Sequence, residues 1–263
     1  MRILCVLILL VCPLSCLATT YAELAIGGGY ECVILVSNTT AFAWRGAFYL
    51  YQGLDQPWVG TWSVVNALKH TANSFVATVP GNGTVKLQIK GDDLVRDGYL
   101  RMYGEYPSTT YDVTLTYCYQ FYLDGKLVMS TNSVDSSLAH KTFYFPVEIS
   151  PDANTGLAWT SQEQNLYPGT GNFSINVSLW RDDGSPILRG DNGSLVVSKP
   201  IQFNGHRSGF LQDFFPELAG ANLRGFIILD APTAFYLDVL RFDSSPNGYG
   251  YLVTNTPPYF QNH

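Results

Sequence analysis

Residues 173–186 read Phe-Ser-Ile-Asn-Val-Ser-Leu-Trp-Arg-Asp-Asp-Gly-Ser-Pro, and this stretch decides the fold class. Ile175, Val177 and Leu179 alternate with polar residues, and a period of two places one face of a strand on a core and the other toward water. The Asp-Asp-Gly-Ser-Pro segment that follows is typical of the tight turn of a hairpin. We therefore expect an antiparallel strand here, partly buried and ending in a turn.

Similar runs of strand-forming residues recur at short intervals, with turn residues such as Asn82-Gly83 between them. In the first part of the chain the expected strands are Cys32–Ser37, Gly46–Tyr51, Ser74–Val79, Thr84–Ile89, Tyr99–Gly104 and Tyr111–Leu123. In the second part they are Thr155–Thr160, Phe173–Trp180, Leu195–Ser198, Gly225–Asp230 and Ala234–Phe242. The one expected helical turn is Phe210–Phe215, ahead of Pro216. The sequence predicts an all-β protein.

The composition excludes several classes of protein. Lysine and arginine number 15 against 21 aspartates and glutamates, for a net charge of −6. So few cations argue against a protein that binds nucleic acid by neutralising phosphates. Charged residues and aromatic residues each make up 14% of the chain, which argues against both a coiled coil and a disordered chain.

The amino terminus has the pattern of a targeting segment. Arg2 precedes a short apolar run that ends at Pro13, and the small residue Ala18 offers a cleavage site. We interpret residues 1–18 as a secretory signal peptide, so the mature chain is expected to be extracellular, periplasmic or on the cell surface. A lipid anchor at Cys16 is the alternative. No other stretch reaches the ~20 apolar residues of a membrane span.

Segments in the two parts of the chain match in pattern at an offset of about 125 residues. Residues 32–38 match residues 155–161, residues 48–57 match 177–186, and residues 98–103 match 225–230. Residues 144–147 are expected to close the first copy as 251–253 close the second. So long a period indicates two domains, and each copy has the size of a sandwich. We expect two tandem antiparallel β-sandwiches from an internal duplication, at residues 22–146 and 147–258.

The second copy resembles an uncharacterised repeat of secreted bacterial proteins. The segments that carry this resemblance are Pro146-Val147, Thr155–Ala158, Leu179–Gly184, Phe210–Pro216, Gly225–Leu229 and Val239–Arg241. The first copy lacks the Phe-Phe-Pro turn and has a longer insertion at Trp58–Lys69. The resemblance implies an immunoglobulin-like or related sandwich in an exported protein. It implies no activity, so no functional residues follow from it.

The aromatic residues of the first copy form the best candidate binding site. Trp58 and Trp62 stand in a loop of turn residues, and Tyr49 and Tyr51 precede them. Exposed flat rings suit stacking on a sugar or contact with a protein. The alternative, which we favour, places these rings in the core or between the domains.

The other candidate chemistry is sparse. Cys32 and Cys118 form either a disulfide or two separate buried thiols. The histidines have no metal-ligand spacing, so no metal or cofactor is expected, although the aspartates at 92, 93, 97, 182 and 183 leave structural calcium as a minor alternative. Glu105 is the best single carboxylate for hydrolysis, and Ser208, two positions after His206, makes no triad.

These observations favour an exported, non-enzymatic β-sandwich protein with a structural, adhesive or surface-interaction role and a protein or polysaccharide partner. The alternative is a carbohydrate-binding module that uses the loop around Trp58 and Trp62. A weakly marked hydrolase is the third hypothesis.

Overall fold

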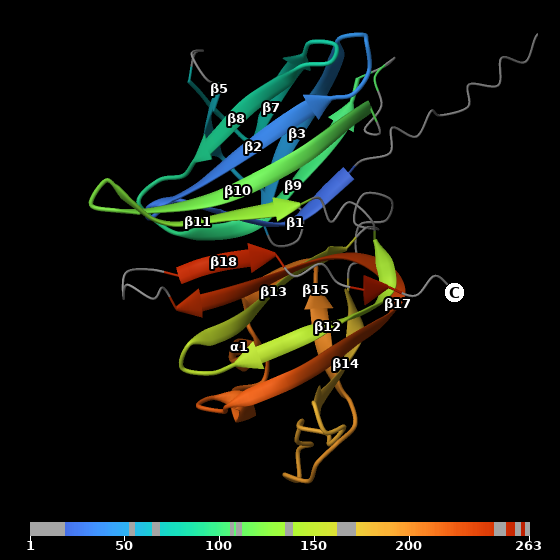
Figure 1. Ribbon diagram of the computed structural model, residues 1–263. Coiled ribbons are helices and arrows are strands. Elements are labelled where there is room, and N and C mark those ends of the chain that lie inside the picture. Colours follow the sequence, from blue (N-terminus) through green and yellow to red (C-terminus); the bar gives the residue numbers. More distant parts are fainter. Residues whose placement is uncertain are drawn as a thin grey trace, which may run out of the picture.

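The computed structural model describes residues 19–52, 56–64, 69–105, 108, 112–134, 139–161, 172–244, 251–255 and 259–260 (Figure 1). The chain is all-β, as expected, and its described strands lie in mainly antiparallel sheets that enclose two hydrophobic cores. We call residues 19–134 the first half and residues 139–260 the second half. The first half lies above the second in Figure 1.

Two facing sheets enclose the core of the first half. One sheet contains, in order, β1 (Thr19–Ile26), β9 (Arg96–Gly104), β3 (Trp44–Gln52) and β4 (Gln56–Pro57), and β7 (Ser74–Val79) also pairs with β3. The other contains β11 (Lys126–Val134), β10 (Val113–Leu123), β2 (Tyr30–Asn38), β8 (Thr84–Lys90), β5 (Gly60–Val64) and β6 (His70–Ala72). Alternate side chains of both sheets point inward, among them Trp44, Phe48, Ile34 and Leu115.

The second half has the same two-layered construction. On one side β12 (His140–Ile149) and β14 (Asn172–Arg181) flank β17 (Leu223–Ser244), with β15 (Lys199–Asn204) beside β14 and β19 (Tyr259–Phe260) beside β12. On the other side β13 (Ala153–Ser161) pairs with β16 (His206–Phe210) and with β17, which also pairs with β18 (Tyr251–Asn255). The turn expected at 210–215 is α1 (Leu211–Phe214), followed by the 3-10 helix η3 (Pro216–Leu218). Leu211, Phe214, Phe215 and Leu218 all pack in the second core.

One long strand, β17, serves both sheets of the second half. Residues 223–230 pair with β12, and residues 235–243 pair with β13. Pro232 stands between these two segments, and proline cannot donate to a sheet ladder. The two strands that the sequence predicted at 225–230 and 234–242 are therefore parts of one strand that passes from one sheet to the other.

The expected strand at Leu195–Ser198 is wrong. This segment forms only an isolated bridge between Leu195 and Arg189, and Leu195 and Val197 are more than half exposed (56% and 57%). Beta-forming residues need a neighbouring strand and a buried face to become part of a sheet.

The order of paired strands matches between the halves. In the first half β1, β9, β3 and β7 follow one another across a sheet, as β12, β17, β14 and β15 do in the second. In the facing sheets, β11, β10, β2 and β8 correspond to β18, β17, β13 and β16. The matched sequence segments 32–38 and 155–161 lie in β2 and β13, at equivalent places.

The expected match of residues 144–147 with 251–253 is wrong. Residues 144–147 lie in β12, which takes the place of β1 and opens the second half instead of closing the first. The buried side chains of β12, namely Phe143, Phe145, Val147 and Ile149, all pack in the second core. The two cores thus divide between β11 and β12, ahead of the boundary that we expected at 146/147.

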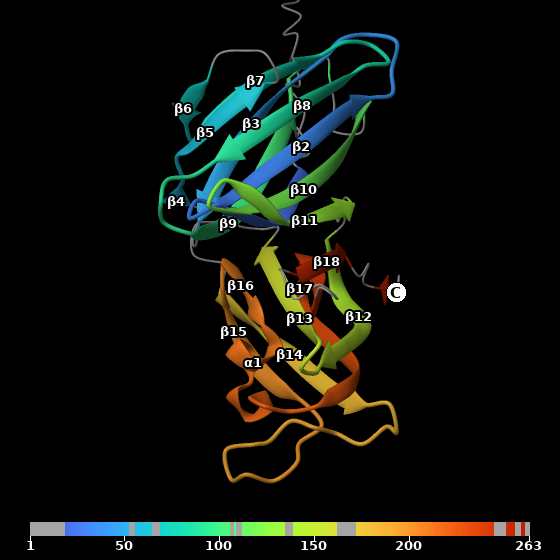
Figure 2. The same cartoon turned by 60° about the vertical axis from the view of Figure 1, so that its left-hand side comes forward.

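The halves are joined through a shared sheet. β11 and β18 pair in parallel, with Thr131 opposite Val253 and Asn132 opposite Thr254. This pair makes one continuous sheet out of β10, β11, β18 and β17, and Figure 2 shows the junction between the two halves from the side.

Candidate functional site

The predicted aromatic loop does not form an exposed platform at Trp58. This side chain is 2% exposed and belongs to the first core. Its ring lies against Gly98 so closely that a Cβ on this glycine would be 2.8 Å from the ring. The interpretation that we favoured, a ring in the core, is confirmed for Trp58, and the alternative of a stacking role for this side chain is wrong. The side chain of Trp62 lies outside the described part of the chain.

Tyr49 and Tyr51 do lie side by side on the outer face of β3. Their ring centroids are 6.4 Å apart, and both side chains are partly buried. Tyr51 stacks on Tyr99 across the strand pair at 5.4 Å, and Tyr103 meets Tyr49 edge-on at 5.6 Å. The guanidinium of Arg101 lies 5.1 Å from the ring centroids of both Tyr51 and Tyr99, a cation–π arrangement. We call these four tyrosines the tyrosine face.

Cys32 and Cys118 lie on neighbouring strands, yet no disulfide joins them. In the register of β2 and β10, Cys32 is opposite Tyr119 and Cys118 is opposite Val33. The two cysteines are therefore one position out of step, and successive side chains of a strand point to opposite faces. Cys32 faces the first core and Cys118 the other side of the sheet. Of the two alternatives, the disulfide is therefore wrong; the cysteines are separate thiols, of which Cys32 is buried and Cys118 is partly exposed.

The carboxylates singled out by the sequence have ordinary structural partners. Glu105 forms an ion pair with Arg45 at 2.6 Å, and Asp92 pairs with Arg96 at 2.7 Å. Asp183 accepts hydrogen bonds from the backbone N–H and hydroxyl of Ser185, which lower the pKa of its carboxyl. Within the described residues, no group of three histidine, cysteine or acidic side chains is placed to hold a metal ion.

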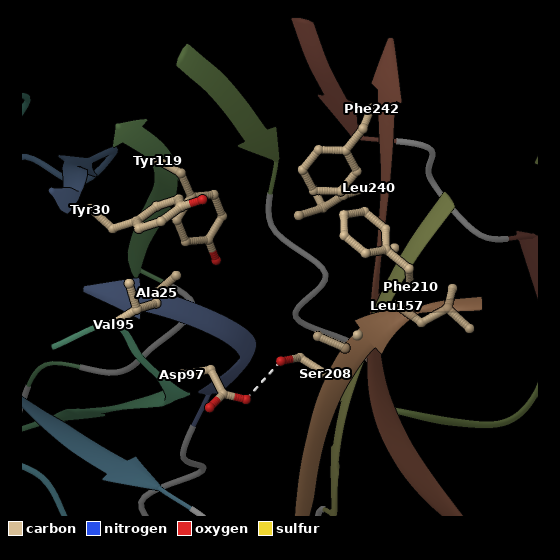
Figure 3. Close-up of a pocket in the computed structure, with 13 residues that line it drawn as sticks. Ala25, Tyr30, Val95, Asp97, Tyr119, Leu157, Ser208, Phe210, Leu240 and Phe242 are labelled. Carbon is tan, nitrogen blue, oxygen red and sulfur yellow. Dashed lines mark hydrogen bonds between the residues drawn. The ribbon is translucent and has the colours of Figure 1, made fainter. Parts of the chain in front are cut away.

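A cavity with a volume of about 340 Å³ lies between the two halves (Figure 3). The first half contributes Ala25, Tyr30, Val95, Asp97 and Tyr119 to its wall. The second half contributes residues of β13, β16 and β17, chiefly Leu157, Ala158, Ser208, Phe210, Leu240 and Phe242. The volume falls near the lower end of the ~300–1,000 Å³ of small-molecule sites. The wall is mostly apolar with few polar groups, which is also typical of such sites.

A turn of three glycines positions the part of the cavity wall that comes from the first half. Gly27, Gly28 and Gly29 join β1 to β2 with φ values of +87°, +55° and +97°, a conformation that L side chains rarely adopt. A Cβ at Gly27 would lie 2.1 Å from the carbonyl oxygen of Leu94. Only glycine at this position therefore lets the segment before β9 lie against the turn. This approach brings Val95 beside Ala25 and Tyr30. Burial raises the pKa of Tyr30 above its ordinary value.

Two features of the second half complete the wall. The ring of Phe242 packs edge-on against Phe210 at 5.0 Å, and a Cβ at Gly156 would be 2.9 Å from that ring. Asp213 accepts a hydrogen bond from the backbone N–H of Phe210 at 2.7 Å, which fixes the corner between β16 and α1.

The polar end of the cavity joins the halves directly. The hydroxyl of Ser208 donates to Oδ2 of Asp97 at 2.7 Å, and Nδ1 of His206 lies 3.8 Å from the same oxygen (Figure 3 shows the first contact). A serine protease triad instead places the histidine between serine and aspartate. Here the carboxylate is in the middle, so the imidazole is not placed to take the proton of Ser208. The arrangement holds β9 against β16.

Further contacts cross between the halves. The hydroxyl of Tyr117 donates to Oδ2 of Asp238 at 2.6 Å, and both side chains are buried. The imidazole of His206 stacks on Tyr99, with ring centroids 5.7 Å apart. The sequence shows Ser208 close to His206, but it does not show that Asp97 lies beside them, because Asp97 and Ser208 are 111 residues apart.

No protein-family model matches the chain, and no curated protein matches it. Among the residues that the structure describes, we find no helix with the length and apolar character needed to cross a bilayer.

Proposed function

We propose that this chain is an exported, non-enzymatic protein with an adhesive or surface-interaction role, in which two sandwiches act as one rigid body. The observation that carries this proposal is the junction: β11 and β18 join the halves in one sheet, and the buried Tyr117–Asp238 hydrogen bond reinforces it. Interfaces between domains of one chain are usually small and permit relative motion. A sheet shared by both sandwiches suits a protein that transmits or withstands a mechanical load.

The proposal is also supported by the pattern of residues 1–18 and by the resemblance to a repeat of secreted bacterial proteins. The equivalent strand orders of the two halves agree with an internal duplication, which we propose as their origin. Neither Glu105 nor Ser208 has the partners of a hydrolase among the described residues: Glu105 pairs with a cation, and Ser208 donates to a carboxylate.

The test begins with export. The full chain and a variant that lacks residues 2–18 are expressed in the same exporting host, and the mass of each product and its compartment are determined. We expect the full chain outside the cytoplasm and cut near Ala18, and the truncated control inside. Retention of the full chain in the cytoplasm overturns the proposal.

The second part of the test concerns binding. The purified mature chain is immobilised and exposed to a panel of polysaccharides and cell-envelope proteins, and the same solutions are assayed for hydrolysis. We expect saturable binding without turnover. Turnover of a substrate that Ser208→Ala or Glu105→Gln abolishes would establish an enzyme instead.

Carbohydrate binding is the second candidate function. Its candidate binding site is the tyrosine face, in place of the loop at Trp58. Tyr49 and Tyr103 meet on the outer face of the sheet, and aromatic rings in such positions suit stacking on sugars. Pull-down on insoluble polysaccharides compares wild type, Tyr49→Ala/Tyr103→Ala and Val76→Ala, which changes a 47% exposed side chain of the adjoining strand. Loss of binding in the tyrosine variant alone supports this function, and equal binding by all three contradicts it.

A further inference from the structure

We propose that the cavity between the halves is a binding site for a small amphipathic cation, an aromatic or branched apolar group that carries a primary ammonium. This site goes beyond the proposed surface role, which does not depend on it. Three properties of the cavity support the inference: its apolar and aromatic walls, its single charge, and its fixed shape.

The walls define the body of the ligand. Tyr30 and Tyr119 lie on one side of the cavity, and Phe210 and Phe242 lie on the other, with Leu240 beside them (Figure 3). Burial of an apolar group between such side chains is favourable at about 25 cal/mol per Å² of surface. The volume of about 340 Å³ limits the ligand to a small molecule.

The charge defines the head group. Among the thirteen lining residues shown in Figure 3, Asp97 is the only acidic or basic side chain, and it is 55% exposed. A carboxylate accepts several hydrogen bonds, so Asp97 can accept from an ammonium while it still accepts from Ser208. Aromatic faces also attract cations within about 6 Å of the ring. An anionic head group would meet the carboxylate with the same sign of charge and would be excluded.

Contacts within the protein fix the shape of the cavity. Asp97 is held by Ser208, Phe210 is held by Asp213, and Gly156 leaves the space that the ring of Phe242 occupies. A preformed site loses little side-chain entropy on binding. Because both halves supply the wall, the site exists only while they are docked.

The test uses three probes of nearly equal shape: 2-phenylethylamine, 2-phenylethanol and 3-phenylpropionate. Binding to the whole mature chain is measured by calorimetry, with ligand-observed NMR for the weaker probes. We expect the amine to bind most tightly, the alcohol more weakly, and the acid least. Equal or tighter binding of the acid overturns the proposal, as does the failure of all three to bind.

Two variants locate the site. Asp97→Asn keeps a hydrogen-bond acceptor for Ser208 but removes the charge, so affinity for the amine should fall about tenfold or more while affinity for the alcohol changes little. Val95→Trp places a large ring at a 60% exposed position of the wall and should abolish binding of both probes. Val59→Trp, at a 57% exposed position that is not part of the wall, is the matched control and should bind as wild type does. If both tryptophan variants bind equally, the amine binds elsewhere and the inference fails.

Discussion

Replacement of Tyr117 by phenylalanine removes one hydroxyl group from the junction between the halves. This hydroxyl donates to Oδ2 of Asp238 at 2.6 Å, a short separation within the ordinary range for a hydroxyl donor. Tyr117 is 3% exposed and Asp238 is 1% exposed, so water does not replace the lost donor in the folded protein. The phenyl ring of the variant fills the same space as the ring of Tyr117, and the substitution therefore tests the hydrogen bond alone.

The expected loss follows from these two properties. Removal of one partner of a buried hydrogen bond leaves the other group without that bond, which costs about 1–3 kcal/mol. We expect Tyr117→Phe to lower the free energy of unfolding by about 2 kcal/mol, which corresponds to a decrease of about 4–8 °C in Tm for a chain of this size. The matched control is Tyr122→Phe on the same strand, whose hydroxyl donates only to the nearby Gln120 at 3.2 Å in a partly buried place. We expect about 0.5 kcal/mol for that change.

The assay is equilibrium unfolding in urea, followed by circular dichroism and by tryptophan fluorescence. If the junction holds the two halves together, the wild-type protein unfolds in one transition by both probes. Tyr117→Phe should lower the midpoint or separate the transitions of the halves, and Tyr122→Phe should do neither. Equal effects of the two substitutions would refute the reasoning, because the inter-half hydrogen bond would then contribute no more than a local one.

Three more predictions concern the core tryptophan, the two cysteines and one histidine. Trp58→Ala should lower the free energy of unfolding by about 3–5 kcal/mol, measured in urea, because this ring packs in the core against Gly98; a loss below about 1 kcal/mol would contradict that packing. Thiol titration of a denatured chain that begins at residue 19, without reductant, should find both Cys32 and Cys118 reactive, and a finding of no reactive thiols in a monomer would contradict the register of β2 and β10. Burial lowers the pKa of His140 below its ordinary value of 6.5, so the unfolded chain takes up this proton first as the pH falls. Stability should therefore decrease below about pH 6.5, and less so in His140→Gln; identical pH profiles of unfolding would contradict this.

The sequence predicted local structure well where the pattern and the turn were both strong. The alternation of Ile175, Val177 and Leu179 gave β14 its buried face, and all three side chains are fully buried (0% exposed). The turn after it has Gly184 at φ +79°, as the Asp-Gly pair suggested. The segments 32–38 and 155–161, which match in sequence pattern, also lie in equivalent strands. Such matches can be found in the sequence because alternation and turn spacing are properties of short segments.

The site depended on contacts that no short segment contains. Asp97 and Ser208 form a pair only because β9 and β16 lie against each other across the junction. The sequence could not show which way the loop at Trp58 folds, since an aromatic residue among turn residues suits both a core and a surface. For Cys32 and Cys118, the pairing of β2 with β10 could be guessed, but the shift of one position in their register could not.

The parallel pairing of β11 with β18 also constrains the order in which the protein folds. β11 ends at Val134, and its partner begins at Tyr251, so more than a hundred residues are synthesised between them. During that interval the outer edge of β11 has backbone groups without a strand beside it, and such an edge pairs readily with strands of other chains. The other described strand pairs of the first half lie within residues 19–134, so they can already be complete by then. Closure of this edge therefore has to wait for the segment 251–255, and until that segment has been synthesised the edge stays open to pairing with other chains.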